Sequence, residues 1–259
     1  MKKITPSIAL IASALLSACS TPPAVHSHLA RFDAPEVANT PLIINYKLGT
    51  NKTNVIPRDT GEPIHDEEDL YLGADITLSH GFEFNAEVSP SSPTFGYGLK
   101  YQLSGESREE AKPGNISHAI SVAYHASGNG EGNDDQGNHY SQSLALYDIA
   151  WISGYRLTPQ WLLYGSLFYQ RGNLEVSYNP DDHRSHCQQN CLSGTLYEQT
   201  SSNYGLSLST EYQPFQYVFV TLEGTYLHAD WYNRDESELA LNAAVTIQFT
   251  PEEVLKGLF

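Results

Sequence analysis

A regular alternation of apolar and polar residues over 70–104 constrains this chain more than any other feature. The even positions of 70–78 and 82–88 are apolar, and so are the odd positions of 95–103. A period of two is that of a β-strand whose two faces have different surroundings. The intervening positions are charged, small or glycine, which suits a crowded polar lumen better than a water-facing surface. We therefore predict a transmembrane β-barrel, with one face of each strand toward lipid and the other toward the lumen.

Similar stretches divide the chain into an all-β, up-and-down antiparallel barrel of about ten strands. The decisive point is His80-Gly81, which as a two-residue hairpin turn separates two strands. A single strand over 70–88 would instead give eight strands and leave 41–49 outside the barrel. Ten is favoured, because spans of 9–11 residues match the bilayer thickness. The expected strands are 41–49, 70–79, 82–88, 94–104, 116–127, 140–157, 161–178, 203–213, 217–229 and 238–249.

The lengths of the connections predict the orientation of the barrel. Thr158-Pro159-Gln160 and residues 213–216 are the two shortest connections. Outer-membrane barrels keep short turns in the periplasm and long loops outside. The loops 128–139, 179–202 and 230–237 are therefore expected to be extracellular.

The amino terminus has the pattern of a bacterial export signal. Lys2 and Lys3 precede a short apolar run that ends in small residues. The sequence Leu16-Ser17-Ala18-Cys19 resembles the lipobox of bacterial lipoproteins, which implies cleavage before Cys19, diacylation of its thiol and, usually, acylation of the new amino terminus. Ser20 is not the Asp that commonly retains lipoproteins at the inner membrane, so the resemblance implies lipid anchoring at the outer membrane. The alternative is an ordinary secretory signal in which Cys19 occurs by chance.

The remaining segments complete the expected domain organisation. Residues 1–18 form the signal peptide, and 19–40 form a flexible tether with three prolines and no apolar periodicity. The barrel domain spans 41–249. Residues 250–259 form a periplasmic tail, in which Thr250-Pro251-Glu252-Glu253 predicts the start of a short helix.

The charge excludes some partners and favours others. The formal net charge is −16, and removal of residues 1–18 takes away two lysines and no acid, giving −18. A nucleic-acid binder needs a basic face, so we expect no nucleic-acid partner. The expected partners are outer-membrane lipid and the barrel-assembly and lipoprotein-sorting machinery, together with a surface ligand that the sequence does not identify. No cofactor or metal is assigned.

The two cysteines of the mature chain besides Cys19 lie four residues apart. In an exported protein, Cys187 and Cys191 are expected to form a disulfide that closes a small loop. The alternative is a metal site that also uses His183 and His186, which are suitable ligand types without a fixed spacing signature.

Two candidate sites for chemistry lie near the outer end of the strand 116–127. His125-Ala126-Ser127 resembles the catalytic arrangement of outer-membrane lipid A deacylases, which implies His125 as general base and Ser127 as nucleophile. The alternation points both side chains into the lumen, where a simple hydrogen-bonded pair is the alternative. Glu131, Asp134 and Asp135 could bind Ca²⁺ or lie in a flexible solvated loop, because they lack an EF-hand pattern.

A set of charged residues is expected in the lumen. Because an isolated buried charge is costly, these groups must be paired or hydrated. They predict either a structural hydrogen-bonded network or a narrow cation-selective pore. The set comprises Asp75, Glu83, Glu87, Lys100, Glu211 and Glu223.

These features together predict a non-enzymatic outer-membrane β-barrel lipoprotein whose acidic extracellular loops bind or shield at the cell surface. Three alternatives remain open at this point. They are a lipid A-directed hydrolase using His125 and Ser127, a cation-selective pore, and a periplasmic lipocalin-like binding lipoprotein.

Overall fold

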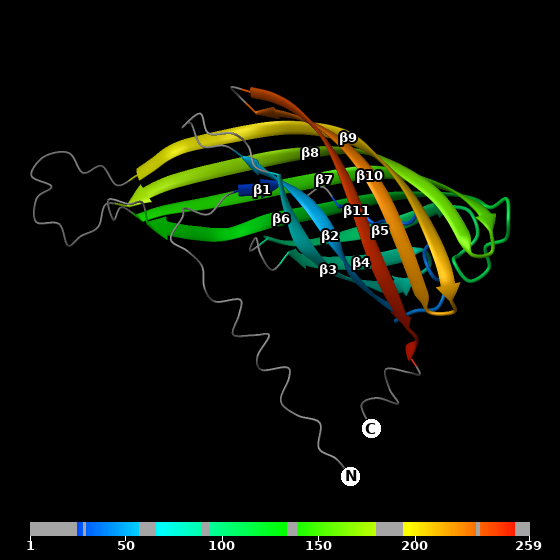
Figure 1. Ribbon diagram of the computed structural model, residues 1–259. Coiled ribbons are helices and arrows are strands. Elements are labelled where there is room, and N and C mark those ends of the chain that lie inside the picture. The colour runs from blue at the N-terminus through cyan, green and yellow to red at the C-terminus, as the bar shows by residue number, and fades with distance from the viewer. Residues whose placement is uncertain are drawn as a thin grey trace, which may run out of the picture.

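Ten antiparallel strands close into a β-barrel in the computed structural model of this chain (Figure 1). The structure describes residues 25–27, 30–56, 66–89, 94–133, 139–179, 194–231 and 234–251. The barrel strands are β2 (Ile44–Ile56), β3 (Asp66–Ser79), β4 (Phe82–Ser89), β5 (Thr94–Ser104), β6 (Ile116–Asn133), β7 (His139–Thr158), β8 (Trp161–Asn179), β9 (Gly194–Phe215), β10 (Val218–Trp231) and β11 (Arg234–Phe249). A short strand, β1 (Val25–Ser27), precedes them.

The barrel has up-and-down topology. Each strand from β2 to β11 pairs with its neighbour in sequence, and β11 returns to pair with β2, so the ring is closed. Where β2 and β11 pair, over Ile44–Gly49 and Ala244–Phe249, closure leaves no free sheet edge, which suits a structure surrounded by lipid. The predicted fold class of about ten antiparallel strands is confirmed.

The turn at His80-Gly81 decides the strand count. Ser79 pairs with Phe82, and the two residues between them both have positive φ, 50° for His80 and 82° for Gly81. Positive φ at both central positions is the geometry of the two-residue hairpin turn that matches the twist of antiparallel strands. The interpretation with a single strand over 70–88 and eight strands is therefore wrong.

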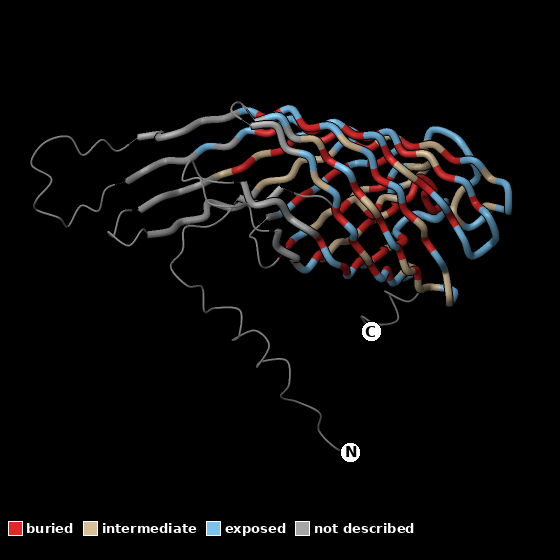
Figure 2. Tube along the Cα trace, turned by 45° about the horizontal axis from the view of Figure 1, so that its top comes forward, coloured by how far each residue is buried: buried red, intermediate tan, exposed pale blue. Residues whose placement is uncertain are grey.

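Buried and exposed residues alternate along the strands (Figure 2), and the two faces have the predicted apolar and polar character. Around the outside lie exposed apolar side chains, and polar or charged residues between them are buried inside. An apolar outer belt is the arrangement of transmembrane barrels. At the short-turn end, Trp161 and Tyr212 pack with ring centroids 5.0 Å apart, where interfacial aromatic residues are expected. The outward-facing set includes Leu48, Phe95, Tyr97, Leu99, Tyr147, Ile149, Trp151, Leu206, Leu208, Leu241 and Val245.

Several strands extend beyond their predicted ends. β6 continues to Asn133, β9 begins at Gly194 and β11 begins at Arg234, so parts of the predicted loops 128–139, 179–202 and 230–237 are strand. The extensions are held by cross-strand pairing, for example Gly132 with Tyr140. Their sequences lack an apolar face, so the alternation that predicts the membrane-spanning part stops before the strand does.

Some predicted features lie outside the described residues. These are the lipobox with Cys19, the loop with His183, His186, Cys187 and Cys191, the acids Asp134 and Asp135, and residues 252–259 of the predicted tail helix. Helical geometry is present at Pro251. Within the described part of the chain, no helix has the length and apolar character needed to cross a membrane.

Candidate functional site

The lumen is occupied by residues 30–38 of the same chain, named here the plug. Along the plug, Ala30, Phe32, Ala34, Glu36 and Val37 are each at most 4% exposed. Residues 30–38 of the predicted tether are therefore packed inside the barrel and are not free. The physical reason is that a segment surrounded by barrel wall on all sides needs no apolar periodicity, because every face of it is buried.

The connectivity requires the plug to run along the barrel. β1 pairs with Asn54–Ile56, whereas β2 begins at Ile44, near the short turns. The chain between β1 and β2 must therefore travel from one end of the barrel to the other. It does so through the interior, where the side chains of several strands contact it.

A charged pair attaches the start of the plug to β7. The Arg31 guanidinium donates two hydrogen bonds to the Asp148 carboxylate, Nη1 to Oδ2 at 2.8 Å and Nη2 to Oδ1 at 2.7 Å. The same guanidinium lies over the Phe168 ring of β8, 4.0 Å from its centroid. Bidentate geometry and a cation–π contact are both strengthened where water is excluded, so this pair fixes the position and the orientation of the segment.

The backbone of the plug is held by two charged side chains from β10 and β2, the strands on either side of β11 in the ring. Glu223 of β10 accepts hydrogen bonds from the backbone N–H groups of Arg31 at 2.7 Å and Phe32 at 3.0 Å. Lys47 of β2 donates to the Phe32 carbonyl at 3.0 Å and lies 2.7 Å from Asp75. These bonds satisfy plug backbone groups that have no strand partner, as burial requires.

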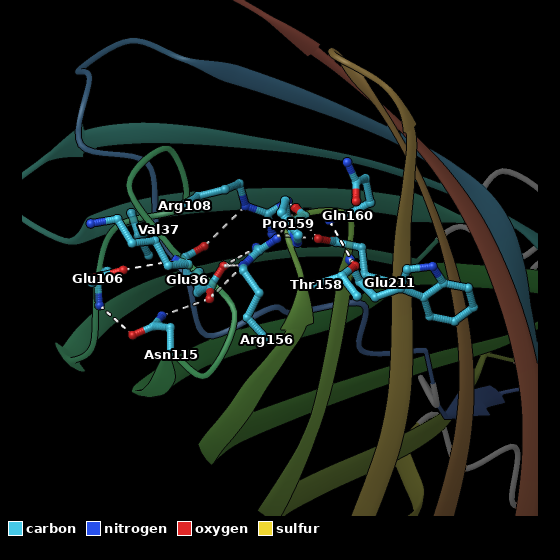
Figure 3. A network of polar contacts seen from close by, with 12 residues as sticks. Glu36, Val37, Glu106, Arg108, Asn115, Arg156, Thr158, Pro159, Gln160 and Glu211 are labelled. Carbon is cyan, nitrogen blue, oxygen red and sulfur yellow. Dashed lines mark hydrogen bonds and ion pairs between the residues drawn. The ribbon is translucent and has the colours of Figure 1, made fainter.

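The end of the plug is held by a larger network near the short turns (Figure 3). Glu36, 1% exposed, receives the Arg156 guanidinium of β7, with Nε 3.0 Å from Oε2, and the Asn115 amide at 2.9 Å. Arg108, from the connection between β5 and β6, donates to Glu211 of β9 at 2.9 Å. The backbone N–H of Arg108 also donates to the Val37 carbonyl at 3.1 Å.

Arg108 lies outside the strands, and its charge is firmly maintained. Burial alone would lower the pKa of its guanidinium, but the negative charges of Glu211 and Glu36 outweigh burial and raise the pKa above its ordinary value. The guanidinium also lies 4.8 Å from the centroid of the Phe219 ring. Arg108 therefore remains cationic at any pH the cell meets and links the connection 105–115 to the plug and the wall.

One side of the lumen is apolar, in contrast to the predicted polar lumen. Lumen-facing residues of β7 and β8 form a buried cluster with Ala34 of the plug. At Gly154 of β7 the plug comes close to the wall, because a Cβ at that position would lie 2.6 Å from Cγ of Pro35. The cluster includes Ala34, Leu144, Leu146, Ala150, Ile152, Leu162, Tyr164 and Phe168. Both faces of β7 are rich in apolar residues, so its period does not show which face is inside.

All six predicted lumen charges have hydrogen-bond or ion-pair partners in the barrel interior. Asp75 lies with Lys47, Glu83 with Lys100 of β5, and Glu87 with His125. Glu211 pairs with Arg108, and Glu223 binds the plug backbone as described above. The predicted set has one base against five acids, because it leaves out four further cations. Lys47 lies in β2, next to Asp75 of β3. Arg31 and Arg108 lie in non-strand segments, and Arg156 lies near the end of β7.

The candidate catalytic residue His125 faces the lumen on β6. Its Nδ1 lies 2.6 Å from Oε1 of Glu87, whose Oε2 accepts a hydrogen bond from the Tyr71 hydroxyl at 3.1 Å. Ser127 pairs through its backbone with Leu144 and Thr94, and its side chain lies outside the described residues. The His125 side chain is 12% exposed and points away from lipid, so its position does not resemble a site that acts on a membrane-embedded substrate.

Two other candidates can be placed in part. Glu131 lies in β6 opposite Ser141, in strand geometry and not in a loop. Among the described residues, no group of three or more His, Cys, Asp or Glu side chains is arranged to hold a metal ion.

Comparison with known proteins gives a structural match and no sequence match. No protein-family model matches the chain, and no curated protein matches it. Among solved structures, the chain is similar to the outer membrane protease OmpT from Escherichia coli, with a TM-score of 0.40 and 10% identity. The match covers 91% of this chain and 100% of that one.

Proposed function

We propose that this protein is an outer-membrane β-barrel lipoprotein with a non-enzymatic role, in which a plugged barrel presents extended strands and acidic loops at the cell surface. The observation that carries the proposal is the attachment of the plug to the wall. Arg31 and Glu36 are bonded to side chains of β7, and Phe32 is bonded to a side chain of β10. A barrel whose lumen is filled in this way is better suited to act as a rigid scaffold than to let a solute pass.

The lumen charges favour the scaffold over a cation-selective pore. A conducting lumen needs charges that face water and are free to interact with a passing ion. Here Asp148, Glu36 and Glu211 each bind an arginine, and Glu223 binds backbone N–H groups. Their charges are already compensated by groups of the protein itself.

The long strands β6 to β9 provide the surface through which binding or shielding would act. They continue past the other strands at the end opposite the short turns (Figure 1). By the rule that short turns are periplasmic, this end is extracellular. The ligand would be recognised by the acidic outer loops, and we propose no nucleic-acid partner for a chain of this charge.

Conductance in planar bilayers tests the proposal. The wild-type protein is expected to give no stable single-channel current. A variant in which residues 30–38 are replaced by Gly and Ser at equal length is expected to conduct, because the plug then has no side chains that bond to the wall. A cation-selective current through the wild type, altered by Glu223→Gln, would contradict the scaffold role.

Lipid attachment needs a separate measurement. Metabolic labelling with palmitate is expected to mark the wild-type protein and not a Cys19→Ala variant. Both proteins are expected to migrate faster on a gel before boiling than after it, since the barrel itself spans the membrane. Absence of palmitate from the wild type would remove the lipoprotein assignment, and loss of the heat-dependent shift would remove the membrane barrel.

A further inference from the structure

The first and last barrel strands pair over only part of their length. The ladder between β2 and β11 covers Ile44–Gly49 and Ala244–Phe249. Each strand continues well beyond this ladder, β2 to Ile56 and β11 back to Arg234. The register between β10 and β11, in contrast, runs unbroken from Val218 to Trp231. We call the line along which β2 and β11 meet the seam. In the half of the seam nearer the short turns the two strands pair, and in the other half they do not pair with each other.

β1 lies along the second half of this seam. Asn54 pairs with Asp66 of β3 and also with Ser27 of β1. A strand has two hydrogen-bonding edges, so β1 must lie on the edge of β2 that faces away from β3. That is the edge on which β11 pairs nearer the short turns. β1 thus pairs with the part of β2 that lies beyond the end of the ladder between β2 and β11.

The chain then enters the lumen from this point. The backbone N–H of Ala30 donates to Oδ1 of Asn51, a fully buried β2 side chain, at 2.9 Å. The plug continues past Asp148 to Glu36, next to the short turn between β7 and β8. Val25, paired with Ile56, therefore lies at the end of the barrel opposite the short turns.

We propose that the acylated amino terminus at Cys19 is anchored in the outer leaflet of the membrane, at the cell surface beside the seam between β2 and β11. This inference rests on the proposed lipoprotein and on the orientation with periplasmic short turns. The partner of the anchor is the lipid of the outer leaflet. The sorting machinery would then hand the protein to an assembly route that places its amino terminus outside.

Chain length supports the outer leaflet over the periplasmic one. Five residues separate Cys19 from Val25, and the six extended steps between them span at most about 20 Å. The ten steps along β2 from Asn54 to Ile44 correspond to about 33 Å of strand. An anchor attached ahead of β1 therefore falls short of the periplasmic end, whereas the outer interface is adjacent.

Single-cysteine labelling of intact cells tests the location. Ala24→Cys would be placed in a chain that carries Cys187→Ser and Cys191→Ser and keeps Cys19, and probed with a bulky, membrane-impermeant maleimide. Two matched variants define the sides of the membrane. Ser185→Cys lies in the predicted outer loop, and Gln160→Cys lies at the exposed turn between β7 and β8.

The expected result is that Ala24→Cys is labelled in intact cells to the same extent as Ser185→Cys. Gln160→Cys should react only after the outer membrane is permeabilised. Labelling of Ala24→Cys that also requires permeabilisation, with the two reference variants behaving as expected, would overturn the inference and leave the proposed function intact. Reversed behaviour of the reference variants would instead overturn the orientation, and absence of palmitate would overturn the lipoprotein assignment.

Discussion

Glu36 and Arg156 meet inside the barrel, with Nε of the arginine 3.0 Å from Oε2 of the glutamate, although they belong to the plug and to β7. Both side chains are almost entirely buried. The Arg156 guanidinium also donates to the Pro159 carbonyl of the adjacent turn at 2.9 Å. One guanidinium of the wall, that of Arg156, thereby binds both the plug carboxylate and a short turn.

Replacement of Glu36 should be strongly destabilising. Glu36→Gln leaves the buried Arg156 without its counter-charge, and the loss of one partner of a buried ion pair costs about 3–5 kcal/mol. The free energy of unfolding would be measured by urea titration of the protein in lipid vesicles. Glu110→Gln serves as the control, because this acid is exposed and contacts Ser107. Equal midpoints for the two variants would contradict the role of Glu36.

The Arg31–Asp148 pair should behave as a coupled unit. Arg31→Met or Asp148→Leu alone is expected to lower the free energy of unfolding by about 3 kcal/mol, because each leaves a buried charge without its partner. The double variant should lose less than the sum of the two single variants, with a coupling energy of about 1–3 kcal/mol. Additive losses in the urea titration would mean that the two groups do not interact as the structure shows.

The contact between Gly154 and Pro35 should be sensitive to a single methyl group. Gly154→Ala places a Cβ 2.6 Å from Cγ of Pro35, and overpacking of this kind costs about 1–3 kcal/mol. Pro35→Ala in the same chain removes the colliding atom and should restore much of the lost stability. Gly224→Ala is the matched control, because the nearest atom, Cδ2 of Leu241, would lie at an ordinary 3.6 Å. A failure of Pro35→Ala to rescue would show that the clash lies elsewhere.

The hairpin at His80-Gly81 gives a prediction about backbone geometry. Gly81→Ala forces a side chain into φ of 82° and should cost about 1–2 kcal/mol. His80→Asn should be neutral or stabilising, because Asn-Gly is a preferred pair for turns with two positive φ values. Both variants would be compared by the temperature at which the folded, fast-migrating band disappears. A destabilised His80→Asn variant would indicate that the histidine ring has another role.

The sequence predicts the wall of this barrel well and its interior poorly. The strand that carries Phe95, Tyr97 and Leu99 has one face toward lipid and the other toward a polar lumen. Its side chains therefore alternate with a strong period of two. Residues 30–38 face protein in every direction, and no period is imposed on them. Their composition, with Arg31, Phe32 and Glu36 close together, is equally compatible with a solvated tether.

The pairing of charges is a second limit of the sequence. Asp75, Glu83 and Glu223 are identified as inward-facing from strand parity alone. Their partners or neighbouring cations, including Arg31 and Arg108, come from segments whose location depends on the closed barrel. A single sequence shows which acids lie inside, but the cations that neutralise them become visible through tertiary structure.

The position of the plug ahead of the first barrel strand imposes an order on biogenesis. Residues 30–38 bond to β2, β7 and β10, which lie on different parts of the ring. The final pairing of β11 with β2 must therefore complete around a segment already in place, since a finished ring would admit it only by threading charged side chains lengthwise. Assembly of this protein is a wrapping of the sheet around its own leading segment, and premature ring closure would trap an empty cylinder with uncompensated acids inside.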